Sequence, residues 1–365
     1  MKKKTAVALC VVLAVLLAGG AVAWSFLPHP LNYRIGAIAP AGNRLRVTEK
    51  TEDSVTVQTA KTGDFKILLF TDMHLDGKNE TSFSTVSHLV ENIQREKPDL
   101  VLLGGDNVTS GVNGVRCRQL ARIFEKLDVY WAGVLGNHEG DNPWSVSRKK
   151  MMEIFTSYDH CLMCTGPADV TGDCNYTLHI LNADGAMLQT FFFLDTFDMM
   201  PDADKPQFGL AGTEKVTDGA RADQVGWYTE KAQTVKEKYG EYRSVLLQHI
   251  PLPQVAEAAD RGDFLFGDQR EKVCCSGFDS GLFDAVKASG TTTAVFCGHD
   301  HLNNFAAEYD GILLSYIEPS GYGSYSMRTK FNAPESEWLQ GYTVLTLQPD
   351  GSFTQRQVRN YEIGE

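Results

Sequence analysis

The chain has 365 residues, of which 43% are hydrophobic and 22% are charged. This composition excludes a disordered chain, and 33 glycines with 13 prolines exclude collagen-like and low-complexity sequences. The net charge of -12 argues against binding to polymeric DNA or RNA, because a surface of that sign repels a phosphate backbone. A small phosphate-bearing substrate is not excluded, since bound metal ions reverse the field inside one pocket.

The first thirty residues have the pattern of an export signal. Lysines at positions 2–4 precede an uncharged apolar run over residues 5–27. Ala21-Val22-Ala23 offers a cleavage site, but the run is also long enough to span a bilayer. A cleaved signal peptide and an uncleaved signal-anchor both fit residues 1–30, and both place the following body outside the cytoplasm. We expect an exported protein, either secreted or attached to the extracellular face of the cell membrane through residues 5–27.

Short apolar runs recur after a polar linker, which we predict over residues 31–63. Each run has the length of a strand and lies between turn or polar residues, which is typical of strands buried on both faces. The predicted strands are Phe65–Phe70, Leu100–Leu103, Tyr130–Leu135, Phe191–Leu194, Val245–Leu247 and Ala294–Cys297.

Helical patterns alternate with these strands. Apolar stripes at helical spacing occur over residues 86–93 and 225–235, and a weaker one over residues 278–289. Near the end of the chain, residues 341–347 and 352–358 alternate around Pro349-Asp350-Gly351, which predicts a β-hairpin. The alternation of strands and helices predicts an α/β layered domain, which we place at residues 64–360.

Five of the predicted strands end in Asp, Asn or His residues, at the edge where α/β sheets build their sites. Carboxylate and imidazole ligands without thiolate suit divalent Mn, Fe, Zn, Co or Ni. Seven ligands are too many for one tetrahedral ion and fit two ions that share a carboxylate, an arrangement common in phosphoryl hydrolysis. The candidate ligands are Asp72, His74, Asp106, Asn137, His249, His299 and His301.

The order of these motifs resembles the calcineurin-like metallophosphoesterase superfamily, and the sequence around His249 and His299 resembles its small purple-acid-phosphatase-related branch. The resemblance covers Phe65 to about Val358 and implies a four-layer αββα sandwich of two mixed β-sheets flanked by helices. The motifs are D-x-H at residues 72–74, G-D-N at 105–107, G-N-H-E at 136–139, a lone His at 249 and G-H-D-H at 298–301.

The resemblance also implies a role for each residue. Asp106 bridges the two ions, a hydroxide between the ions attacks phosphorus, and His138 protonates the leaving group. Beside the family roles, Glu139 or Asp141 is a candidate to orient the His138 imidazole, and Asp300 is a candidate to support the ligands. For each of these three acids, a solvated loop carboxylate is the alternative. The family pattern assigns Asp72, His74 and His301 to one ion, and Asn137, His249 and His299 to the other.

The family's purple members carry a Tyr ligand three residues after the bridging Asp. Thr109 stands at that position here, so the resemblance implies a pair of divalent ions and not a ferric site. We expect a phosphatase or phosphodiesterase that hydrolyses phosphate mono- or diesters. The alternative is a cell-surface binding protein that retains the metal site without catalysis.

Three cysteines lie close together in one loop-like stretch, at positions 161, 164 and 174. In an exported protein a disulfide within this group is one expectation. Structural zinc is the weaker alternative, because a single C-x-x-C without a second pair is poor evidence for a zinc site.

Overall fold

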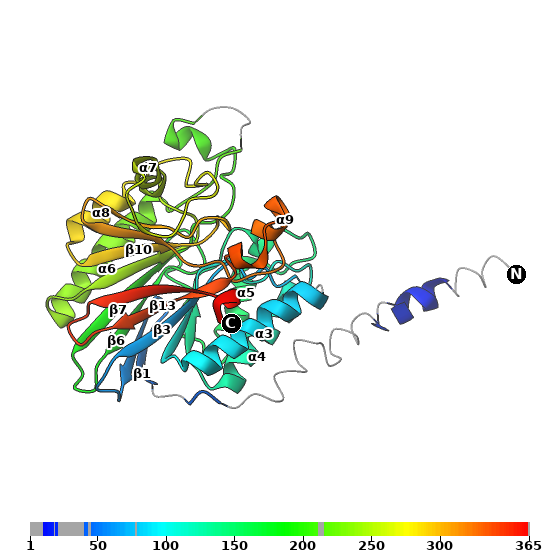
Figure 1. Cartoon of the computed structure of the whole chain (residues 1–365), viewed down its shortest axis with the longest axis horizontal. Coiled ribbons are helices and arrows are strands. Elements are labelled where there is room, and N and C mark those ends of the chain that lie inside the picture. Colours follow the sequence, from blue (N-terminus) through cyan, green and yellow to red (C-terminus); the bar gives the residue numbers. More distant parts are fainter. Residues whose placement is uncertain are drawn as a thin grey trace, which may run out of the picture.

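The computed structural model describes residues 10–17, 19–20, 40–42, 45–76, 79–210 and 215–363. In this part of the chain, two β-sheets lie between two sets of helices (Figure 1). This is the layered α/β arrangement that the motifs predicted. On one side lie α3 (Asn79–Glu96), α4 (Asn113–Leu127) and α5 (Arg148–Phe155); on the other lie α6 (Ala222–Tyr239), α7 (Pro253–Arg261) and α8 (Leu282–Ser289).

The smaller sheet has the strand order β14-β13-β3-β4-β5. The strands β3, β4 and β5 are parallel, and β13 pairs antiparallel with β3. β13 and β14 form the predicted hairpin, with Leu347 opposite Phe353 next to the turn. The bounds are β3 Phe65–Phe70, β4 Leu100–Leu103, β5 Trp131–Gly133, β13 Gly341–Leu347 and β14 Phe353–Arg359.

The larger sheet has the order β1-β2-β6-β7-β8-β10-β12-β11-β9. Its central strands β7, β8, β10 and β12 are parallel, so their carboxyl ends meet at one edge. The bounds are β1 Leu45–Lys50, β2 Ser54–Thr59, β6 Tyr176–Leu181, β7 Met187–Leu194, β8 Ser244–Gln248, β9 Phe264–Phe266, β10 Thr292–Cys297, β11 Ala306–Tyr309 and β12 Ile312–Tyr316.

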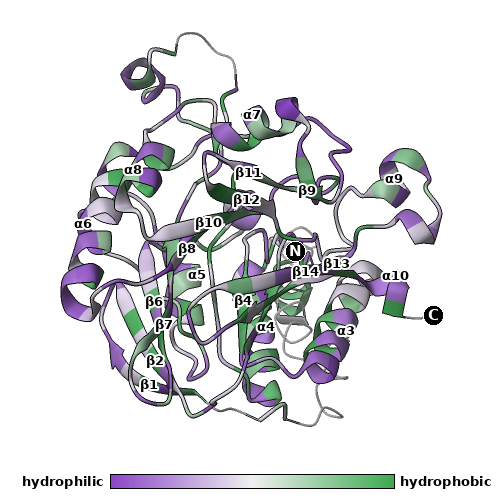
Figure 2. Ribbon diagram, turned by 60° about the vertical axis from the view of Figure 1, so that its left-hand side comes forward, coloured by the Kyte–Doolittle hydropathy of each residue, from purple (hydrophilic) through white to green (hydrophobic). Residues whose placement is uncertain are grey.

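Part of the predicted linker over residues 31–63 is strand. β1 and β2 lie there and form one edge of the larger sheet. β1 has a single buried residue, Leu45. It is the edge strand of the sheet and pairs with β2 alone, so its other side faces solvent. Its polar composition, which suggested a linker, is that of an exposed edge strand (Figure 2).

The central strands are buried on both faces, as predicted. Phe191 and Phe193 of β7 belong to the core between the two sheets. Phe192 and Leu194 point to the opposite face and pack with residues of α6, such as Tyr228. The side-chain period of two thus divides one apolar run between two cores.

The predicted leader lies mostly outside the described residues, although residues 10–17 are helical. In the ranges that the structure describes, no helix has the length and apolar character needed to cross a membrane. The disulfide expected among Cys161, Cys164 and Cys174 is not formed; all three are buried free thiols. The Cys174 sulfur lies 3.5 Å from the Leu135 nitrogen, and the Cys164 sulfur lies 3.9 Å from the Leu162 carbonyl oxygen.

Candidate metal centre

The candidate ligands come from both sheets. Asp72 and His74 follow β3, Asp106 follows β4, and Asn137 follows β5 in the smaller sheet. The larger sheet contributes the residues after β8 and β10, which are His249, His299 and His301. Because the strand ends of the two sheets meet, seven residues spread over 230 positions of sequence lie at one place.

The first group of donors comprises Asp72, His74 and His301, whose donor atoms lie within 4.8 Å of one another. The His74 Nε2 is 3.1 Å from the His301 Nε2, which is 3.4 Å from the Asp72 Oδ1. The Nδ1 of His301 lies 3.0 Å from the Tyr325 carbonyl oxygen. An N–H at that position donates to the carbonyl and leaves the Nε2 lone pair free for a cation.

The second group comprises Asp106, His249 and His299. The His249 Nε2 lies 3.4 Å from the Asp106 Oδ2 and 3.1 Å from the Asn137 Oδ1. On its other side, the His249 Nδ1 is 2.8 Å from the Gly104 carbonyl oxygen, so the ring is oriented in the same way as that of His301.

Asp106 lies between the two groups. Its Oδ2 is 3.5 Å from the His74 Nε2 of the first group and 3.4 Å from the His249 Nε2 of the second. This oxygen is buried and has no hydrogen-bond partner among the residues that the structure describes. The other oxygen, Oδ1, accepts the backbone N–H of His138 at 2.8 Å. A buried carboxylate oxygen that faces both groups and accepts no hydrogen bond is suited to a cation, so the donor set fits a pair of metal ions.

The electrostatics of the donors agree with this fit. Burial lowers the pKa of His74 to about 4 and that of His299 to about 3, so both rings are neutral and offer lone pairs. Burial also acts to lower the pKa of His249, but the carboxylates of Asp106 and Asp72 raise it to about 10. The paired carboxylates therefore favour positive charge at the centre.

The backbone at the centre is strained. Asp72, His74, Asp106 and His299 have positive φ angles of 54°, 45°, 50° and 80°, in the left-handed region that most residues avoid. Such conformations cost about 1 kcal/mol or more each and are concentrated at functional sites. Backbone bonds hold them here, since the His74 N–H donates to the Asp106 carbonyl at 2.8 Å.

Two glycines of the motifs allow close approach. A Cβ on Gly136 would lie 2.2 Å from the Asp106 Oδ1, and a Cβ on Gly105 would lie 2.5 Å from the His249 Nδ1. Gly105 also has a φ of +99°. The G-D-N and G-N-H-E motifs therefore require glycine for steric reasons, and Gly105 requires it for its positive φ as well.

His138 lies at the exposed side of the centre. Its ring centroid is 5.6 Å from that of His74, and its Nδ1 pairs with the Asp141 carboxylate. Burial acts to lower the His138 pKa, but Asp106 and Asp141 outweigh it and raise the pKa above its usual value. Of the two acids that the sequence offered as partners of this imidazole, the structure places Asp141 in contact.

Glu139 serves the backbone and not the imidazole. Its buried carboxylate accepts the N–H groups of Asn107 at 2.6 Å and Gly136 at 2.8 Å. Asp300 likewise holds neighbouring segments in place: its carboxylate accepts the Cys274 N–H at 3.0 Å and the Tyr316 hydroxyl at 2.5 Å.

Two groups near the centre carried no sequence signal strong enough to assign them. The Tyr325 ring stacks on His301 with centroids 4.3 Å apart, and its loop composition alone suggested a turn. The Cys274 thiol lies within 4.8 Å of donor atoms of His299 and Asp300. Only the three-dimensional approach of β10 to the segment after β9 brings this thiol to the centre.

Comparisons with known proteins show the family and the fold. A family model described as calcineurin-like phosphoesterase matches residues 65–303. "Probable inactive purple acid phosphatase 14" of Arabidopsis thaliana is 28% identical over 295 residues, which cover 72% of each chain. Phosphatase DCR2 of Saccharomyces cerevisiae is 25% identical over 315 residues, which cover 78% of this chain and 50% of that protein. A solved dimetal phosphatase from Danio rerio has a TM-score of 0.51 at 16% identity, covers 81% of this chain and 97% of its own, and shows the same fold.

Proposed function

The chain belongs to the calcineurin-like phosphoesterase family, and on that premise we propose that it is an exported two-metal phosphatase that hydrolyses phosphate mono- or diesters. The observation that carries the proposal is the Asp106 Oδ2, which faces both donor groups and, within the described ranges, has no hydrogen-bond partner. Although the Arabidopsis relatives are named inactive, none of the seven expected donors is missing in this chain.

The proposed ligands follow the two groups. Asp72, His74 and His301 would hold one ion, Asn137, His249 and His299 would hold the other, and Asp106 would serve both. Two divalent ions bound there would supply Lewis-acid activation of water and of the phosphoryl group. Thr109 in place of a Tyr ligand supports a divalent pair such as Mn, Fe, Zn, Co or Ni.

The chain's own residues then handle the leaving group. His138 is the proposed general acid, which protonates the leaving oxygen from its Nε2 while its Nδ1 is paired with Asp141. Asp106, a proposed metal ligand, also positions the proposed acid His138. Its Oδ1 accepts the backbone N–H of His138 and so fixes the start of the short helix His138–Gly140.

The test is hydrolysis of p-nitrophenyl phosphate and bis-p-nitrophenyl phosphate by the full-length protein, after chelation and again after addition of Mn²⁺. We expect activity that returns with the metal and falls about 10²-fold or more in Asp106→Asn. Asp310→Asn is the matched control, because Asp310 is an exposed carboxylate paired with Lys287. Metal binding without hydrolysis of either ester would refute the phosphatase and favour a binding protein that keeps the site.

A further inference from the structure

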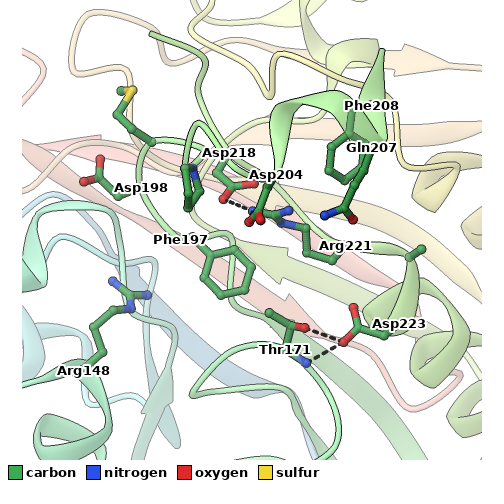
Figure 3. Close-up of a pocket in the computed structure, with 13 residues that line it drawn as sticks. Arg148, Thr171, Phe197, Asp198, Asp204, Gln207, Phe208, Asp218, Arg221 and Asp223 are labelled. Atoms are coloured by element: carbon green, nitrogen blue, oxygen red, sulfur yellow. Dashed lines mark hydrogen bonds and ion pairs between the residues drawn. The ribbon is translucent and has the colours of Figure 1, made fainter. Parts of the chain in front are cut away.

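A cavity of about 730 Å³ is lined by Phe197, Asp198 and other residues that follow the carboxyl end of β7 (Figure 3). β7 is the parallel neighbour of β8, whose end carries His249. The two strand-end segments are joined, because the Thr196 hydroxyl oxygen accepts the Ile250 N–H at 3.0 Å. Arg148, in the cavity wall, donates to the carbonyl of Gly136 in the G-N-H-E motif. The cavity therefore adjoins the side of the centre on which His138 lies.

Asp198 is a residue of the cavity wall that lies near the proposed acid, His138. It lines the cavity, and it is close enough to the centre that burial and the charges of Asp141 and Asp106 raise its pKa. In the part of the chain that the structure describes, no side chain or backbone N–H donates to its carboxylate. Asp198 is thus an exposed carboxylate near the proposed acid, with no hydrogen-bond donor among the described residues.

The cavity is negatively charged. Its lining contains four carboxylates and two guanidinium groups, a difference of two negative charges. Both guanidinium groups already pair with carboxylates: Arg148 lies 2.5 Å from Asp195, and Arg221 lies 2.6 Å from Asp218 and 3.2 Å from Asp204. The fourth lining carboxylate, Asp223, accepts from the N–H and hydroxyl of Thr171 and from the Gln224 N–H, and it forms no ion pair in the part of the chain that the structure describes. The charge left over in the cavity attracts cations and repels further anionic groups.

Aromatic rings complete the lining. Arg221 holds its guanidinium carbon 5.8 Å from the Phe197 ring centroid and 5.4 Å from that of Phe208, so a cation of the chain itself already lies against both rings. Phe208 also packs on Phe278, with ring centroids 4.0 Å apart, which leaves Phe197 as the ring nearer the cavity's carboxylates. Phe197 has a φ of +60°, which is a strained conformation for a bulky residue. The chain thus holds this ring at the wall next to Asp198 at a cost in backbone energy.

We propose that this cavity holds the alcohol portion of the phosphate ester and selects alcohols that carry a cationic ammonium group. The carboxylates of Asp198 and Asp223, which form no ion pair in the described part of the chain, attract a quaternary or protonated amine that enters beside the Phe197 ring. The inference rests on the proposed phosphatase function, whose centre supplies the place of the phosphate. It names the substrate class of that centre as phosphate esters of amino alcohols.

The first test compares two esters of the same shape and different charge. Choline phosphate and its neutral carbon isostere, dimethylbutyl phosphate, are hydrolysed by the full-length protein with Mn²⁺. We expect kcat/KM to favour the cationic ester about tenfold, and Asp198→Asn to bring this ratio close to one. Asp184→Asn, a change at an exposed hairpin carboxylate, is the matched control and keeps the wild-type ratio. A wild-type ratio near one, or a ratio that Asp198→Asn leaves unchanged, overturns the inference.

The second test separates this inference from the proposed function. Trimethylammoniopropyl phosphonate and dimethylpentyl phosphonate carry the same pair of groups on a C–P bond that hydrolysis does not break. Calorimetry on the Mn²⁺-loaded protein should show about tenfold tighter binding of the cationic phosphonate, with the preference lost in Asp198→Asn. Equal binding of the two overturns the inference even in an active enzyme. A binding preference in a protein that hydrolyses no ester supports the cavity chemistry and refutes the phosphatase.

Discussion

Asp141→Asn tests whether His138 acts as an acid that Asp141 tunes. The two side chains are paired but 44% and 46% exposed, so solvent screens the pair. An ion pair this exposed contributes about 0.2–1 kcal/mol. At 1.36 kcal/mol per pKa unit, removing the Asp141 charge lowers the His138 pKa by roughly half a unit.

The sign of the effect on activity follows from the protonated form. The acid form of His138 is lost as the pH rises through its pKa, which the folded protein raises above the usual value. Lowering that pKa moves the alkaline limb of the pH–rate profile to lower pH by the same half unit or so. Esters with poor leaving groups should show the shift clearly, because their departure requires a proton.

The assay is the pH dependence of kcat/KM for ethyl phosphate and p-nitrophenyl phosphate in the Mn²⁺-loaded protein. His138→Gln should cost about 10²–10⁴-fold on the ethyl ester and far less on the nitrophenyl ester. Glu153→Gln is the matched control, since Glu153 forms an exposed pair with Lys150 on α5. An alkaline limb that stays in place in Asp141→Asn, or equal losses on both esters in His138→Gln, would refute the assignment.

Three further predictions concern the centre and the core. Chelation should lower the Tm in a calorimetric scan, because ions that bind only the folded state stabilise it by about 2.7 kcal/mol at 100 times their Kd; an unchanged Tm would show that no ion is bound. Gly136→Ala should weaken Mn²⁺ affinity at least about tenfold by titration, because its Cβ would lie 2.2 Å from the Asp106 Oδ1, whereas the open position Gly226→Ala should not change it. Burial lowers the His179 pKa to about 4, so the free energy of unfolding of the wild type should fall by about 2 kcal/mol between pH 7 and pH 5. His179→Gln should not show this fall in urea unfolding at the two pH values, and an equal fall in wild type and variant would contradict the prediction.

Much of the architecture is predictable because buried parallel strands leave a direct trace in sequence. Runs such as Leu100–Leu103 are apolar throughout and end in polar residues, and both features follow from burial on two faces and from a site at the sheet edge. The hairpin around Pro349-Asp350-Gly351 was predictable for a similar reason, since its turn chemistry is local.

What escaped prediction depends on partners distant in sequence. β1 reads as a linker because its outer face meets solvent and only pairing with β2 makes it a strand. The contacts of Tyr325 with His301 form across 24 residues and leave no local pattern. The cavity near Asp198 likewise arises where the end of β7, the start of α6 and α5 come together.

Each donor group draws on both sheets, and this has a consequence for how the protein assembles. Asp72 and His74 of the smaller sheet meet His301 of the larger one, and Asp106 of the smaller sheet meets His249 and His299 of the larger. Neither sheet alone holds a complete set of donors for either ion. High-affinity metal binding therefore requires that the two sheets have packed together, and it can be used to follow that step of folding. A variant that loosens the core between the sheets would then release its ions while its helices and strands persist, and metal retention becomes a more sensitive measure of the native state than secondary structure.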